Sequence, residues 1–176
     1  MKLLPGDYRV DDRDVMLVTI LGSCVAACIH DPLAHVGGMN HFMLPASRSA
    51  RDGDSARYGA YAMEVLINEI LKRGGERPRL RAKVFGGAAV LPSLTTSNVG
   101  QDNVDFVTAY LATEHIASVA SDLGGAWPRR VHFFPATGRA FVKRLPAAQR
   151  DPVGAEEARY RQRLGRAPRT GPVELF

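Results

Sequence analysis

The run Val15–Ile29, which contains no charged side chain, constrains the fold more than any other feature. It is rich in β-branched and apolar residues, and Gly22 divides it into Val15–Ile20 and Val25–Ile29, which are predicted to be short buried strands. The run is 15 residues long, whereas a membrane-spanning helix needs roughly 20 apolar residues. We therefore expect core strands and no insertion into a membrane.

The same run contains Leu21-Gly22-Ser23-Cys24, which looks like the lipobox of a lipoprotein signal. A secretory signal starts with a positively charged segment. The residues before Val15 carry three basic and four acidic side chains, and this disfavours a signal. Two cysteines are too few for a disulfide framework, and no histidine spacing near them indicates a structural zinc site, so a reducing compartment is expected.

A hairpin is predicted directly after this run. Asp31-Pro32 is a turn signal, because proline presets φ and the aspartate side chain bonds to the local backbone. Strand-like residues resume at Val36–Leu44. We therefore expect the second half of the run and Val36–Leu44 to pair around a four-residue loop, Asp31–Ala34.

This register would place a thiol beside an imidazole, because His30 then faces His35 and Cys24 faces His41. Directly opposed residues have Cβ atoms about 4.5–5.5 Å apart, which is close enough for a hydrogen bond between the two side chains. A slip of one residue would send the two groups to opposite faces of the hairpin, so the contact depends on the register.

A cysteine and a histidine in contact suit nucleophilic catalysis. The thiolate is the nucleophile, and an adjacent imidazole can take the thiol proton. Thr19 is the nearest hydroxyl besides Ser23 that could orient the His41 ring, as the third group of a catalytic triad does. Gly22 allows a sharp bend before Cys24, and backbone N–H groups near Cys24 could form an oxyanion hole.

Each of these residues also has a purely structural interpretation. Buried cysteines usually pack as small apolar side chains, and we prefer this interpretation for Cys28. His30 and His35 flank the predicted turn and are expected to face solvent. Thr19 is also an ordinary β-branched strand residue. Spacing alone does not decide whether the thiol–imidazole pair is structural or catalytic.

The rest of the chain mixes helices and strands without a strict βαβ alternation, which predicts an α+β fold. Helices are expected over Ala56–Lys72 and Asp102–Glu114, strands over Leu80–Phe85, Ile116–Ala120, Val131–Phe134 and Arg139–Lys143, and a polar loop over Arg48–Ser55. The first of these strands ends in Phe85, Gly86 and Gly87, which either line a site by close backbone approach or only end the strand.

The positive charge of the chain is concentrated in one segment. The net charge is +5, and Ala126–Leu145 contains five basic side chains and no acidic one. A basic face can attract an acidic partner, but a solvated hairpin is the preferred interpretation. No zinc-finger, RRM-like or helix-turn-helix signature is present, so no nucleic-acid partner is expected.

The composition changes after Pro146. A short helix is expected within Ala155–Leu164, followed by a tail punctuated by proline and glycine at Arg166–Gly171. We therefore divide the chain into a main domain, residues 1–146, and a C-terminal extension, residues 147–176.

The segment "LGSCVAACIHDP", followed by "GGMNHFMLP", resembles the signature of CheD, the chemoreceptor glutamine deamidase family of bacterial chemotaxis. Four later segments are similar to blocks of the same family in the same order. They are "AKVFGGA", "NVDFVTAYLATEHI", "SDLGG" and "VHFFPATGRAFVKRL". The resemblance covers nearly the whole chain.

The resemblance implies a cytoplasmic enzyme that hydrolyses glutamine side-chain amides on methyl-accepting chemotaxis receptors to glutamates. It implies a role for Cys24 as the nucleophile, His41 as the base and Thr19 as the third catalytic residue. It also implies mixed β-sheets flanked by helices, similar to the catalytic domain of cytotoxic necrotizing factor deamidase toxins.

Several further expectations accompany this resemblance. Gly22, Ser23 and the segment Phe85–Gly87 would lie at the oxyanion hole or line the site. A glutamine on a receptor helix would need a shallow, accessible groove. No cofactor or metal is expected, and some members of the family bind the phosphatase CheC. The alternative function is a non-catalytic adaptor that binds receptors or CheC.

Overall fold

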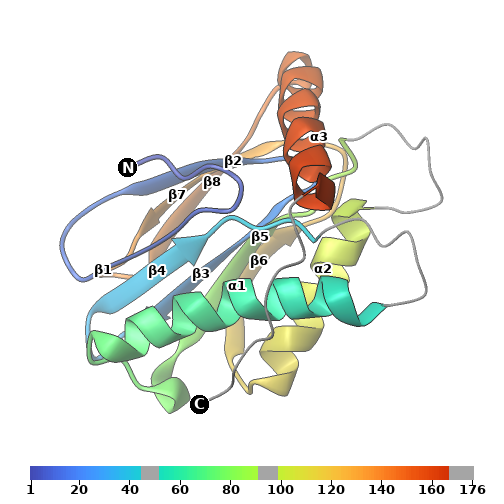
Figure 1. The fold of residues 1–176 in the computed structure, drawn as a ribbon. Coiled ribbons are helices and arrows are strands. Elements are labelled where there is room, and N and C mark those ends of the chain that lie inside the picture. The colour runs from blue at the N-terminus through green and yellow to red at the C-terminus, as the bar shows by residue number, and fades with distance from the viewer. Residues whose placement is uncertain (45–51, 91–98, 167–176) are drawn as a thin grey trace.

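The computed structural model describes residues 1–44, 52–90 and 99–166, and in this part of the chain the strands form two sheets (Figure 1). The larger sheet has the order β1-β4-β3-β5-β6, and the smaller has the order β2-β7-β8. The strands of the larger sheet are β1 (Tyr8–Asp11), β3 (Val25–Asp31), β4 (Val36–Asn40), β5 (Arg81–Gly86) and β6 (Ala117–Leu123). Those of the smaller sheet are β2 (Leu17–Leu21), β7 (Arg129–Phe134) and β8 (Arg139–Arg144). Only the β5–β6 pair is parallel among these strand pairs.

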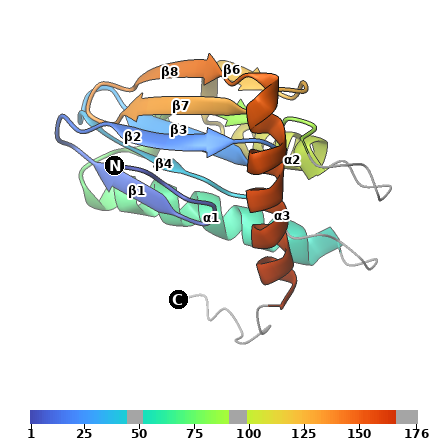
Figure 2. The ribbon, with the colours of Figure 1, turned by 90° about the horizontal axis from the view of Figure 1, so that it is seen from above.

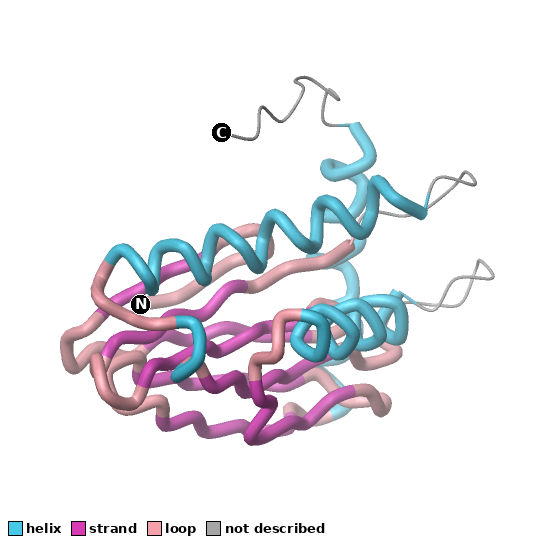
Figure 3. The backbone as a smooth tube through the Cα atoms, turned by 90° about the horizontal axis from the view of Figure 1, so that it is seen from below, coloured by secondary structure: helices cyan, strands magenta, loops and turns pink. Residues whose placement is uncertain are grey.

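The sheets and two helices form three layers. The larger sheet lies between the smaller sheet and the helices α1 (Asp52–Lys72) and α2 (Val99–Thr113), as Figures 2 and 3 show. Strand β3 is buried on both faces because its side chains alternate between two cores. Ala27 and its alternate neighbours pack toward α1 and α2, whereas Ala26 and Cys28 pack toward the smaller sheet.

The predicted α+β class is confirmed, and the predicted strands and helices lie at or near the observed ones. The predicted loop Arg48–Ser55 is wrong at residues 52–55, which form the first turn of α1, while residues 48–51 lie outside the described part of the chain. Strand β1 was not expected. It pairs with β4 at the edge of the larger sheet, where its sequence is too polar to read as a buried strand.

The predicted hairpin exists, but its register is wrong by two residues. His30 lies opposite Gly37 rather than His35, and Asp31 lies opposite Val36. The loop is therefore residues 32–35, because Asp31 is the last strand residue and its buried carboxylate accepts hydrogen bonds from loop N–H groups. A two-residue shift keeps every side chain on its face, since side chains alternate along a strand.

The two turn histidines differ in their surroundings. His35 is exposed, as expected, and has a positive φ of 52°. His30 does not face solvent fully as predicted: it is partly buried against Gly138, and its Nε2 lies 3.4 Å from the carbonyl oxygen of Ala136. The burial lowers the pKa of the His30 ring.

A third helix, α3 (Arg150–Arg166), follows a short 3₁₀ turn at Ala147–Gln149 and lies across the end of β2 (Figures 1 and 2). It is longer than the predicted Ala155–Leu164 helix. Another 3₁₀ turn, Arg77–Arg79, precedes β5. In the described part of the chain, no helix combines the length and apolar character that crossing a membrane requires.

Candidate active site

The segment Gly22–Cys24 connects the two sheets, since β2 ends at Leu21 and β3 begins at Val25. Its three carbonyl oxygens all have partners. Ala88 N–H donates to Gly22 at 2.7 Å, Asn103 Nδ2 to Ser23 at 2.8 Å and Gly87 N–H to Cys24 at 2.8 Å. Because one side of the segment is fixed through its carbonyls, its N–H groups are free to converge on a ligand.

The glycines after β5 support this segment. Gly86 has a φ of +115°, and a Cβ at this position would lie 2.1 Å from the carbonyl oxygen of Cys24. Phe85 pairs with Ala26 and packs in the core between the two sheets. Phe85, Gly86 and Gly87 are thus placed behind the backbone of Cys24, and none of them lines the cavity beside His41 described below.

Thr19 and His41 form a hydrogen-bonded pair across the two sheets. Thr19 Oγ1 lies 2.7 Å from His41 Nδ1 and also donates to the carbonyl oxygen of Leu3 at 2.9 Å. A threonine hydroxyl has one proton. Since the Thr19 hydroxyl uses that proton to donate to the Leu3 carbonyl oxygen, Nδ1 of His41 must be the donor to Thr19, and Nε2 carries the free lone pair. His41 Nε2 has no hydrogen-bond partner among the described residues.

The N-terminal segment fixes the backbone of His41. Gly6 N–H donates to the His41 carbonyl oxygen at 2.8 Å, and His41 N–H donates to the carbonyl oxygen of Asp7 at 2.9 Å. Its neighbour Phe42 pairs with Val25 in both directions. The backbone that carries the imidazole is therefore held by the N-terminal segment on one side and by β3 on the other.

Cys24 and His41 lie close together but are not directly opposite each other. The Cys24 sulfur, a ring nitrogen of His41 and a carboxylate oxygen of Glu157 all lie within 4.8 Å of one another. In the observed register Cys24 would face Met43, two residues from the predicted partner, so the thiol and the imidazole are diagonal neighbours on one face. The proximity that the sequence predicted thus arises from a different pairing, and no hydrogen bond joins the Cys24 thiol to the ring of His41.

Glu157 of α3 occupies the N–H side of the Gly22–Cys24 segment. Its Oε1 accepts from Gly22 N–H at 2.8 Å and Cys24 N–H at 3.1 Å. Its Oε2 accepts from Ser23 N–H and Ser23 Oγ, both at 2.7 Å. Three convergent N–H groups that hold a carboxylate form an anion site of the kind that stabilises an oxyanion.

The expectation of an open groove is wrong for this conformation, because α3 covers the site. Cys24 is 0% exposed and His41 is 2% exposed. Burial, and then the charge of Glu157, raises the pKa of the Cys24 thiol. Burial lowers the pKa of His41 to about 3. Both side chains are therefore neutral at pH 7 in the covered site.

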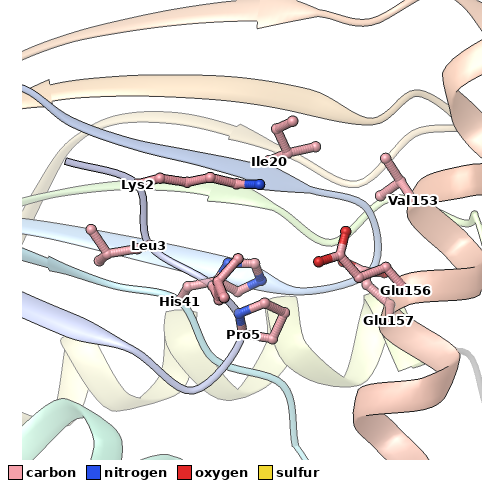
Figure 4. A pocket seen from close by; sticks show the side chains of 9 residues that line it. Lys2, Leu3, Pro5, Ile20, His41, Val153, Glu156 and Glu157 are labelled. Carbon is pink, nitrogen blue, oxygen red and sulfur yellow. The ribbon is translucent and has the colours of Figure 1, made fainter.

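A small cavity remains beside His41 (Figure 4). In Figure 4, His41 comes from one side and Glu157 from α3 on the other. The lining residues are Lys2, Leu3, Leu4, Pro5, Ile20, His41, Val153, Glu156 and Glu157. The cavity thus lies between the N-terminal segment and α3, where a displaced helix would open it further.

Cys24, His41 and Glu157 are also residue types that bind metals such as Zn²⁺. Their geometry fits a different use, because each carboxylate oxygen of Glu157 already accepts two hydrogen bonds from the Gly22–Cys24 segment. The N–H groups of the Gly22–Cys24 segment therefore form an anion-binding site next to the Cys24 thiol.

Sequence reasoning missed Asn103 and Glu157. Asn103 is fully buried, and its Oδ1 accepts from Leu44 N–H at 2.8 Å while its Nδ2 holds Ser23. Glu157 stands in a charged helix, where a glutamate normally faces water, and its partners are more than 130 residues away in the chain. No local pattern signals either contact.

The basic segment is only partly available to a partner. Arg129 is buried and donates to Asp122 at 2.9 Å, so it is a structural cation. The other four basic side chains of the segment are exposed: Arg130, Arg139, Lys143 and Arg144. Docking of an acidic partner would therefore depend on β8 and its neighbour.

Comparison with known proteins gives the family. The family model described as "CheD chemotactic sensory transduction" matches residues 43–144. A protein of Xanthomonas campestris pv. campestris named "Probable chemoreceptor glutamine deamidase CheD" is 57% identical over 175 residues, which cover 99% of this chain and 88% of that protein. A protein of Burkholderia mallei with the same name is 55% identical over 184 residues, covering 100% of this chain and 79% of that protein.

Among solved structures, a hypothetical protein YfiH of Bacillus licheniformis aligns with a TM-score of 0.36 and 19% identity over 56% of this chain and 33% of the other. A likeness this low supports no conclusion about function. The two sequence matches are much stronger than this structural match, because more than half of the aligned residues are identical and the alignments cover 99% and 100% of this chain. The chain therefore belongs to the CheD family of chemoreceptor glutamine deamidases.

Proposed function

We propose that this protein is a cysteine-dependent hydrolase that converts glutamine side chains of chemotaxis receptors to glutamates. The family supports the reaction and the class of substrate. One observation carries the assignment of residues: a thiol, a histidine with a free Nε2 lone pair and three convergent N–H groups meet at one point. A protein that only binds receptors has no use for this combination.

In the proposed mechanism, His41 Nε2 takes the proton of the Cys24 thiol, and the sulfur attacks the carboxamide carbon of the glutamine. The oxygen of that group becomes negative and accepts hydrogen bonds from the N–H groups of Gly22–Cys24. His41 then gives its proton to the amide nitrogen, which leaves as ammonia. A thioester on Cys24 remains.

Water completes the reaction. His41 Nε2 accepts a proton from the water, which attacks the thioester and releases a glutamate side chain. Thr19 serves as a positioning residue, because its Oγ1 accepts a hydrogen bond from Nδ1–H and so keeps the Nε2 lone pair toward the reacting atoms. Each turnover adds one negative charge to the receptor.

We propose that this enzyme acts in the cytoplasm, because its proposed substrates are glutamines in the cytoplasmic part of chemoreceptors. A CheC-type phosphatase is a candidate regulatory partner. We also propose that residues 1–146 form the deamidase domain and that residues 147–176 are an extension with a separate role.

The decisive experiment is an assay on cytoplasmic fragments of the organism's own receptors. Mass spectrometry should detect a gain of about one dalton at particular glutamines with the wild-type protein, and at none with Cys24→Ala. Cys28→Ala is the matched control, because Cys28 is the other buried thiol and lies four residues further along the chain, in β3. It should retain activity.

Two outcomes would contradict the proposal. Deamidation by Cys24→Ala would remove the nucleophile assignment. If the wild-type protein converted no glutamine in any native receptor fragment, the non-catalytic adaptor would be the better description.

A further inference from the structure

The side chain that covers the active site is chemically the product of the proposed reaction. Glu157 is 2% exposed, and its carboxylate accepts four hydrogen bonds from the Gly22–Cys24 segment. It also lies within 4.8 Å of the ligand atoms of Cys24 and His41. A glutamate side chain carried on a helix thus sits where a newly formed glutamate of a receptor would sit.

The hydrogen-bond donors favour a carboxylate over a carboxamide at this position. Each carboxylate oxygen of Glu157 accepts a hydrogen bond from a backbone N–H group. A glutamine could present its oxygen to Gly22 and Cys24, but its amide nitrogen would then meet the Ser23 N–H, and only Ser23 Oγ could accept from it. The site therefore holds product more tightly than substrate.

Few apolar contacts keep α3 in place. Val153 and Tyr160 are its buried apolar side chains among those described, and Leu164 is partly buried. Apart from Glu157, half of its ten other described side chains are both polar and exposed, and Gly154 lowers its helix propensity. A helix of 17 residues with this composition is marginal on its own, so its attachment depends on polar contacts. Tyr160 hydrogen-bonds to Tyr58 at 3.0 Å and Arg150 donates to the carbonyl oxygen of Ala89 at 2.8 Å, while Glu157 accepts four hydrogen bonds and is the largest of these contacts.

We propose that α3 is an internal product mimic: Glu157 occupies the glutamyl subsite of the enzyme, and a receptor helix can enter only when α3 leaves. This inference rests on the proposed function. It assigns a subsite to the N–H groups of Gly22–Cys24 and a regulatory role to the C-terminal extension. Cys24 and His41 have almost no access to solvent while the helix is bound.

The proposal makes a glutamine at position 157 an internal substrate. In Glu157→Gln, the Cys24 sulfur bonds to the side-chain carbonyl carbon, the carbon–nitrogen bond breaks, and the nitrogen leaves as ammonia with a proton from His41. Water then breaks the carbon–sulfur bond, and the thiolate regains its proton. Glutamine and water become glutamate and ammonia, so the variant restores its own wild-type sequence.

The experiment is to purify full-length Glu157→Gln and follow residue 157 by peptide mass spectrometry. Residue 157 should gain about one dalton at a rate that does not depend on protein concentration. The control lies on the same helix, since Gln162 is an exposed natural glutamine. It should stay unconverted.

Catalysis is separated from spontaneous deamidation by the double variant Glu157→Gln/Cys24→Ala, which should keep the introduced glutamine. Conversion in this double variant would overturn the proposal. So would an introduced glutamine that stays unconverted in a protein that still deamidates receptor fragments, since the function would then stand without the subsite. If neither the introduced glutamine nor any receptor glutamine is converted, the proposed function itself fails.

A second measurement does not depend on turnover. In Glu157→Ala, α3 loses its main polar contact, so the alkylation of Cys24 by iodoacetamide should be at least several-fold faster than in the wild type. Cys28 is the internal control, because it is the other buried thiol and lies four residues further along the chain, in β3, and its rate should not change. Equal alkylation of Cys24 in both proteins would mean that the helix does not close the site.

Discussion

At the scale of single residues, the state of His41 follows from one hydroxyl proton. Thr19 donates that proton to Leu3 and accepts from His41 Nδ1, so the ring must carry its hydrogen on Nδ1. This leaves Nε2 as a base at the point where it has no other partner among the described residues. A side chain without a hydroxyl at position 19 would leave Nδ1–H buried and unpaired, and the ring could turn or change its tautomer.

We therefore expect Thr19→Val to lower kcat for receptor deamidation by about 100-fold, the lower end of what a general base contributes. Thr19→Ser keeps the hydroxyl and should retain most of the activity. Thermal unfolding of both variants tests whether the loss is catalytic or structural. Equal kcat values for Thr19→Val and the wild type would remove Thr19 from the mechanism.

Single residues also mark the limit of what the sequence reveals. The turn signal and the Gly-Ser-Cys step were enough to bring Cys24 and His41 near each other in the prediction, and the structure places them together. Glu157 could not be found in this way. A buried carboxylate on a polar helix is recognisable only when its distant N–H partners are known.

At the scale of the element, the β3–β4 hairpin depends on Asp31. Its carboxylate accepts from the N–H groups of Leu33 and Ala34 in the loop, from Glu76 N–H, and from Arg79. Burial alone would raise the pKa of Asp31, but these hydrogen bonds outweigh it and lower the pKa to about 2. The ionised carboxylate therefore stabilises the loop and attaches it to the segment before β5.

The expected result of Asp31→Asn is a loss of about 1.5–3 kcal/mol of unfolding free energy at pH 7, because hydrogen bonds to a charged group are lost. A lowered folded-state pKa stabilises the protein above the unfolded pKa of about 4, and this contribution disappears as the pH falls toward 2. Urea unfolding of both proteins should thus show a difference at pH 7 that narrows below pH 4. A constant difference would contradict this account.

The hairpin also shows why its register was predicted wrongly. Asp31 looked like the first loop residue, because Asp-Pro is a turn signal. Its side chain does bond to the loop, but its backbone still pairs with Val36. The Asp-Pro sequence indicates that a turn is present, but it does not indicate which residue is the last of the strand. The face of each side chain was nevertheless correct, because an even shift preserves alternation.

At the scale of the whole molecule, Arg129 ties the two sheets together. It belongs to β7 of the smaller sheet, and its guanidinium donates to the Gly86 carbonyl at 3.2 Å, the Gly124 carbonyl at 2.7 Å and Asp122 at 2.9 Å. These partners lie in or beside β5 and β6 of the larger sheet. From sequence Arg129 seemed part of a basic surface, since nothing local identifies its partners.

Because a buried cation with several partners is costly to remove, Arg129→Met should lower the unfolding free energy by about 3 kcal/mol or more. Arg130→Met is the matched control, since Arg130 is the next residue of the same strand and is exposed. It should change stability by less than about 0.5 kcal/mol. Similar urea midpoints for the two variants would mean that the sheets do not depend on Arg129.

The attachment of His41 to the N-terminal segment affects how a newly made chain becomes active. The imidazole is set in place only after Gly6 and Asp7 have bonded to its backbone and Thr19 of the other sheet has bonded to its ring. Contacts between segments distant in sequence form slowly, because each closes a long loop. Recovery of catalytic activity during refolding would therefore report the closing of these particular contacts rather than the compaction of the chain.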